Sequence, residues 1–116
     1  MSEQLQEFKI QKMRECADRL AVAVSEHTFL DHYRKVVLAG LMKKYMVQSS
    51  GKALSVNAQE REALTDPEYV EFLKKLKEAE KEKVFWQSQW TVFKTDFEVW
   101  KTKSINQTVE MKAYGT

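Results

Sequence analysis

The residue types that carry most enzyme chemistry are sparse in this sequence. His27 and His32 lie five residues apart, which places them on different sides of a helix and makes them poor joint ligands for a metal ion. Cys16 is the single cysteine, and it is most simply a small buried apolar residue. There is no glycine loop for phosphate and no nucleophile motif. We therefore predict a protein that is not an enzyme, with no catalytic residue, no metal and no cofactor.

A local excess of positive charge is more informative. The net charge of the whole chain is only +2, yet no acidic residue lies between Asp31 and Glu60. We call residues 32–59 the basic segment. It favours an anionic partner such as the phosphates of a nucleic acid, although a chance run of surface lysines explains it equally well. The candidate nucleic-acid-binding residues are Arg34, Lys35, Lys43, Lys44, Tyr45 and Lys52.

These residues do not share one stripe of a helix. Lys35 and Lys43 are about 80° apart on a helical wheel, and the other helical cations point elsewhere. The predicted surface is therefore the end of a helix together with the start of a connector. Tyr45 would supply a ring on which a base stacks, and Gln48, Ser49 and Ser50 would supply hydrogen-bond donors.

One aromatic stretch must organise the elements that position this surface. Five large rings recur at steps of four, three, four and three, which places them on one stripe of a helix. The stripe represents on the order of 1,000 Å² of surface that must be buried. A second apolar line, with residues seven apart, is rotated by roughly 100° from the first. The aromatic stripe is Trp86, Trp90, Phe93, Phe97 and Trp100, and the second line is Phe85, Val92 and Val99.

The rest of the chain also has helical signals. With three Gly and one Pro, the sequence has room for long helices and little room for a turn-rich β fold. The first helix either breaks near residues 26–28 or runs through them without a break. In the connector, Ser55 could cap a short helix. We predict a helix over 3–47, a connector over 48–64, a long helix over 66–103 and a short tail over 104–116.

Smaller signals mark particular positions. Gly51 suits a left-handed residue where the first helix stops. Thr65 with Glu68 matches a capping box, and Pro67 fits the first turn of the long helix. Gly40 either permits a close backbone approach or is accidental.

Two long helices with a connector predict an all-α fold: an antiparallel two-helix hairpin, or a three-helix one if the connector helix forms, as a single domain over residues 1–116. A hairpin covers one apolar line on each helix and leaves the second line unpartnered. We therefore predict that chains assemble into a helical oligomer through the aromatic stripe and the second line. The alternative is a monomer in which the connector or the tail covers the second line.

Cellular location has weaker signals. A single cysteine fits a reducing cytosol. No apolar run approaches the ~20 residues that cross a bilayer, and the N-terminal residues lack the apolar core of a signal peptide. We expect a cytoplasmic protein with no membrane partner.

The layout of residues 20–114 resembles the UvsY-like recombination mediator proteins of phages. Residues 35–38, KVVL, followed by Lys44-Tyr45 and the QSSG turn, are similar to the basic helix and glycine turn of that family. The run DPEYVEFLKKLKEA before an aromatic helix is also similar, as is the ending KTKSINQTVEMKAYGT. One departure is that Ala39 and Leu41 stand where a family member carries a Lys and an Arg.

The resemblance implies a specific function. Such proteins form rings of helical hairpins in the cytoplasm of the infected host and bind single-stranded DNA without sequence preference. They help to load a RecA-like recombinase onto strands covered by single-strand-binding protein, without a metal or nucleotide of their own. If the resemblance holds, either Lys35, Lys43 and Lys44 replace the missing charges or the binding is weaker than in that family. The rival interpretations are a non-enzymatic helical oligomeric adaptor, and an assembly chaperone or antitoxin-like inhibitor that binds another protein.

Overall fold

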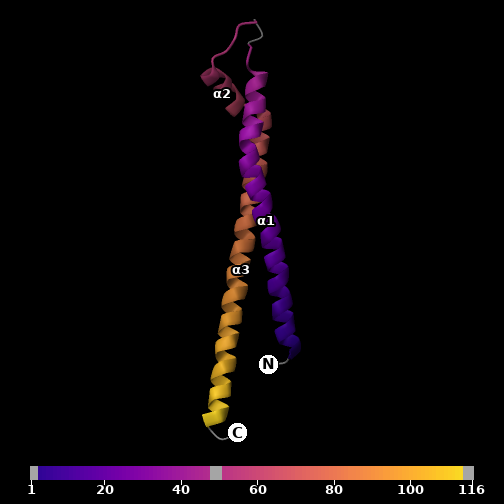
Figure 1. Ribbon diagram of the computed structural model, residues 1–116, viewed down its shortest axis with the longest axis vertical. Helices are drawn as coiled ribbons and strands as arrows, with labels where there is room; N and C mark the ends of the chain where they lie inside the picture. Colours follow the sequence, from indigo (N-terminus) through magenta and orange to yellow (C-terminus); the bar gives the residue numbers. More distant parts are fainter. Residues whose placement is uncertain (1–2, 48–50, 114–116) are drawn as a thin grey trace. The chain divides into compact units, whose positions relative to one another are not determined.

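The computed structural model describes residues 3–47 and 51–113, and these residues form three helices and no strand (Figure 1). Helix α1 spans Glu3–Lys44, α2 spans Val56–Leu64 and α3 spans Pro67–Ala113. The predicted all-α fold is confirmed: α1 and α3 are the two long helices of an antiparallel hairpin, and α2 is a short third helix in the connector.

The chain divides into two compact units, each containing part of both long helices. The first unit combines Met1–Val22 with Val84–Thr116, and the second unit spans Ala23–Lys83. In the first unit, α1 and α3 are joined by an ion pair of 2.6 Å between Lys9 Nζ and Asp96 Oδ2. In the second unit, the rings of Tyr33 and Phe72 have centroids 6.3 Å apart. Within each unit the two long helices therefore pack side by side and antiparallel.

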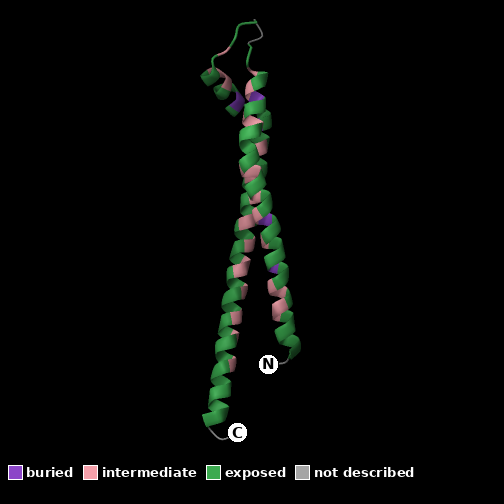
Figure 2. Cartoon of the chain, in the orientation of Figure 1, coloured by how far each residue is buried: buried purple, intermediate pink, exposed green. Residues whose placement is uncertain are grey.

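The less exposed positions of α3 follow the aromatic stripe (Figure 2). In the second unit, Tyr69 is buried at 6% exposure, and in the first unit the tryptophans of the stripe are half-buried. The row keeps steps of three and four, so one side of α3 faces α1 in each unit. Its members are Tyr69, Phe72, Leu76, Ala79, Lys83, Trp86, Trp90, Phe93, Phe97, Trp100 and Ser104.

Helix α1 runs without a break through residues 26–28, so the unbroken alternative is correct. Ala23 is buried, and His27 and Leu30 are half-buried at the same three- and four-residue spacing. Because packing continues through this stretch, a new helix start would offer only the small gain of a cap. His27 lies on the packed side of α1.

The first helix ends at Lys44, three residues before the predicted end. The backbone N–H groups of Tyr45 and Met46 donate to carbonyls three residues earlier, which tightens the last turn. Leu54 N then donates to Met46 O at 3.0 Å, and Val47 faces Ala53 in an isolated bridge. Gly51, with φ of 84°, permits this reversal, as predicted.

Two predictions about helix starts had different outcomes. Ser55 caps α2 as predicted, because its Oγ accepts a hydrogen bond of 3.2 Å from Ala58 N. The Thr65–Glu68 capping box is wrong. Thr65 closes α2 instead, and its hydroxyl donates to the carbonyls of Arg61 and Glu62.

The predicted tail over 104–116 is wrong where the structure describes it, because α3 continues to Ala113. No Gly or Pro lies between Ser104 and Ala113, so nothing in the sequence stops the helix there. Ser104 continues the half-buried row, and its carbonyl accepts a 3.0 Å hydrogen bond from the Thr108 hydroxyl. Residues 114–116 lie outside the described part of the chain.

Two glycine-to-alanine changes should have opposite effects on stability. Gly40 is exposed within α1, and an added Cβ would meet no atom within 4 Å, so no close backbone approach requires this glycine. Gly40→Ala should therefore stabilise the fold by about 1 kcal/mol. Gly51 also has open space, but its φ of 84° disfavours a side chain, so Gly51→Ala should cost roughly 1 kcal/mol. Urea unfolding at one fixed protein concentration measures both changes, and equal signs would contradict this account.

Candidate nucleic-acid interface

The predicted nucleic-acid-binding residues all lie in the second unit. Arg34, Lys35 and Lys43 are exposed on α1, and Lys52 is exposed in the connector. The Arg34 guanidinium lies 3.9 Å from the Asp31 carboxylate. This ion pair is exposed and therefore weak. Lys35, Lys43 and Lys52 form no ion pair with any residue that the structure describes. These three ammonium groups are therefore available to an anionic partner.

A small apolar cluster fixes the end of α1 that carries these cations. Leu41, Ala63 and Tyr69 are buried, at 5%, 0% and 6% exposure, and they bring together α1, α2 and α3. Half-buried side chains from the last turns of α1 and from the residue just after it surround them, including Val37 and Tyr45. The contact holds α2 against the end of α1, so the connector and the basic end of α1 form one local structure.

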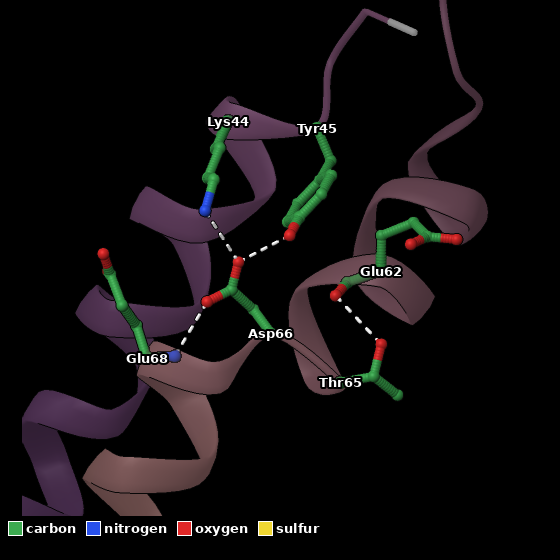
Figure 3. A network of polar contacts seen from close by, with 6 residues as sticks. All are labelled: Lys44, Tyr45, Glu62, Thr65, Asp66 and Glu68. Atoms are coloured by element: carbon green, nitrogen blue, oxygen red, sulfur yellow. Dashed lines mark hydrogen bonds and ion pairs between the residues drawn. The ribbon is translucent and has the colours of Figure 1, made fainter. Parts of the chain in front are cut away.

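Lys44 and Tyr45 are occupied within the chain (Figure 3). Lys44 Nζ lies 3.0 Å from Asp66 Oδ2, and the Tyr45 hydroxyl donates to the same oxygen at 2.5 Å. Asp66 Oδ1 accepts a 2.8 Å hydrogen bond from Glu68 N, which makes Asp66 the cap of α3. We call Lys44, Tyr45, Asp66 and the Glu68 N–H the Asp66 cluster. It ties the end of α1 to the start of α3.

The electrostatics of the Asp66 cluster follow from its donors. Asp66 is 1% exposed, but three donors surround its carboxylate. The Tyr45 hydroxyl, then the Glu68 N–H and the Lys44 ammonium, lower the pKa of Asp66 to about 2. In return, the hydrogen bonds to Asp66 raise the pKa of Lys44 and of Tyr45 above their ordinary values. At neutral pH the cluster therefore holds one carboxylate and one ammonium, both charged.

Sequence reasoning did not find Asp66. The signal available was its position directly before Pro67, where an Asp can cap a helix that starts with proline. Its pairing with Lys44 and Tyr45 depends on how the hairpin closes, which the sequence does not display.

The Asp66 cluster makes Lys44 and Tyr45 weaker candidates for nucleic-acid binding than the other cations. The Tyr45 ring is half-buried, and Lys44 Nζ lies 5.4 Å from its centroid, so a stacking role would require both side chains to leave Asp66. Arg34, Lys35, Lys43 and Lys52 need no such rearrangement. The hydrogen-bond donors expected from residues 48–50 lie outside the described residues.

The candidate assembly residues lie in the first unit and fall into two groups. The aromatic stripe packs toward α1: the Arg19 guanidinium lies 5.1 Å from the Trp86 ring centroid, and Cys16 Sγ donates to Trp86 O at 3.8 Å. Burial raises the pKa of the Cys16 thiol, consistent with a packing role. The second line is different, because about half of each of its side chains remains exposed. The exposed fractions of Phe85, Val92 and Val99 are 50%, 60% and 48%.

Two other features are absent from the described residues, a metal-binding cluster and a membrane-spanning helix. Over residues 3–47 and 51–113, no group of three or more His, Cys, Asp or Glu side chains is arranged to hold a metal ion. In the same ranges, no helix combines the length and the apolar character needed to cross a membrane.

The fold and these surfaces define an all-α helical hairpin protein with a basic end in one unit and an exposed apolar line in the other. No protein-family model, no curated protein and no solved structure matches the chain.

Proposed function

We propose that this protein is a cytoplasmic, self-assembling accessory factor of DNA recombination that binds single-stranded DNA without sequence preference. In this proposal it helps to load a RecA-like recombinase onto strands covered by single-strand-binding protein. The loading role is supported by the resemblance of residues 20–114 to UvsY-like phage mediators. The binding role is supported by the surface of the second unit.

One observation carries the proposed binding. Lys35, Lys43 and Lys52 are exposed, have no described ion-pair partner, and lie in a segment without acidic residues. Lysines of this kind neutralise phosphates and release counterions, which requires no particular base sequence. The interaction is long-range and weakens steeply with salt.

Assembly strengthens this weak surface. A few cations on one chain bind a polyanion poorly, but copies of the same cations in an oligomer act at high effective concentration on one strand. The exposed second line of α3 supplies the surface for assembly. The function therefore depends on both units of the chain.

Charge reversal tests the binding surface. The double variant Lys35→Glu with Lys43→Glu should weaken binding to labelled oligo-dT by roughly tenfold or more, because each lost cation removes a phosphate contact. Lys44 is left unchanged, since reversing its charge would also place two carboxylates together at Asp66. A fluorescence anisotropy titration at low salt measures the change.

The matched control is Lys77→Glu with Lys81→Glu, which changes two exposed lysines of α3 outside the basic segment. It alters the net charge equally and should affect binding much less. Circular dichroism checks that both variants remain helical. Equal losses in the two variants would show that net charge, not the proposed surface, governs binding.

A second candidate function is that of a helical adaptor or assembly chaperone that binds another protein. The exposed second line favours it, because an apolar face also fits a foreign helix. Oligo-dT distinguishes the two candidates: an adaptor gives no mobility shift even at low salt, and a chaperone or inhibitor retains one tight protein partner in a pull-down.

A further inference from the structure

The exposed side of α3 in the first unit carries a second heptad pattern that contains no charged residue. From Phe85 to Val109, exposed residues recur at steps of three and four. N-terminal to Phe85, the same spacing passes through Lys81, Glu78 and Lys74, so the uncharged row begins abruptly. We call this row the outer seam. Its members are Phe85, Ser88, Val92, Thr95, Val99, Thr102, Asn106 and Val109.

The outer seam has the length and the side-chain sizes that allow another helix to pack against it. It covers roughly 36 Å of helix at 1.5 Å per residue. The Thr102 hydroxyl donates to Glu98 O at 3.0 Å, so its polar atom is already satisfied inside α3. Small residues at Ser88, Thr95 and Thr102 allow close approach of a helix axis, while Phe85, Val92 and Val99 supply apolar surface.

We infer that the outer seam binds the outer seam of a second copy of this chain, with the two α3 helices parallel and in register. This inference rests on the self-assembly in the proposed function and names the partner surface. The occupant is argued from charge and residue type. An uncharged row of residues over this length packs best against a helix whose uncharged residues have the same spacing. The outer seam of a second copy is such a row.

Flanking charges decide the orientation. In a parallel pair, a residue just before an apolar core position meets the residue five positions further along on the other helix. Glu98 of one copy then meets Lys103 of the other, twice by symmetry. In an antiparallel pair centred on the seam, Glu98 would face Glu98 of the second copy. Glu98 and Lys103 form no ion pair with a described residue of their own chain.

Core residue types point the same way. Val92, Val99 and Asn106 occupy equivalent positions one heptad apart. A single asparagine at such a position pairs with its own copy and fixes the register of a parallel pair. Parallel pairing places Asn106 against Asn106, whereas antiparallel pairing places it against Ser88.

Disulfide trapping tests the orientation. In a Cys16→Ala background, Val99→Cys should give a covalent dimer of most of the protein on mild oxidation, because the two Val99 Cβ atoms face each other in a parallel pair. Gln87→Cys, on an exposed flank away from the seam, is the control and should give only background cross-linking. Non-reducing electrophoresis reads out both variants, and light scattering of the reduced protein reports assembly.

The outcomes separate this inference from the proposed function. Selective cross-linking of Val99→Cys supports parallel pairing. An oligomer in which Val99→Cys cross-links no more than the control overturns it and leaves self-assembly standing, whereas monomeric reduced protein overturns both. As an independent check, Glu98→Lys and Lys103→Glu should each weaken assembly, and the double variant should restore it. Two additive losses would contradict the proposed ion pairs.

Discussion

Replacing Val92 with glutamate is expected to break the proposed assembly into single chains of 13.6 kDa. Val92 is 60% exposed at the centre of the second line, where assembly would bury it against other copies. A carboxylate taken out of water there has no described cation to pair with, and its desolvation opposes association. Light scattering at micromolar concentration measures the change in mass.

The same variant should lose DNA affinity although it leaves the basic segment intact. If copies act together on one strand, single chains should bind oligo-dT at least roughly tenfold more weakly. Gln87→Glu is the matched control, because it adds the same charge to an exposed position of α3 off the second line. A Val92→Glu protein that is monomeric yet binds like the unchanged chain would refute the link between assembly and binding.

Replacing Asp66 with alanine should cause a large loss of stability in the second unit. The change removes the cap of α3 and leaves the Lys44 ammonium and the Tyr45 hydroxyl without their acceptor. We expect the melting temperature to fall by roughly 10 °C. The melting temperature should fall less for Asp66→Asn, since an amide oxygen still accepts from Glu68 N. It should fall least for Thr65→Ala, which removes two exposed hydrogen bonds.

The contribution of Asp66 should depend on pH in a defined direction. Its pKa is about 2 in the folded protein, below the ordinary value of 3.8, so folding favours the charged form. The stabilisation is therefore complete above pH 3.8 and is lost as the pH falls from about 4 toward 2. The difference in melting temperature between the unchanged protein and Asp66→Asn should shrink over that range. A constant difference would show that the charge on Asp66 is not what stabilises the cluster.

The sequence predicts the long elements of this fold well. The three- and four-residue spacing of Trp86 to Trp100 is a property of one helix, and it correctly identified the side of α3 that packs. The capping role of Ser55 and the left-handed backbone of Gly51 were also predictable, because each acts through its own backbone or its nearest neighbours. Signals that operate within one or two turns are visible in a linear sequence.

Contacts between distant residues were not predictable in the same way. Tyr45 and Lys44 suit a nucleic-acid surface by residue type, but closure of the hairpin brings Asp66 against them. Thr65 fits a capping box by pattern, yet it lies at the junction of two helices and closes the first of them. The predicted C-terminal end of α3 comes too early because weak helix formers such as Ser104 and Asn106 do not stop a helix by themselves.

The most direct test of the account is a titration of labelled oligo-dT and of duplex DNA of equal length at about 50 mM and about 200 mM salt. We expect binding of the single strand at low salt and a steep loss of affinity at the higher salt. No binding of oligo-dT at low salt, by protein that light scattering shows to be assembled, would contradict it.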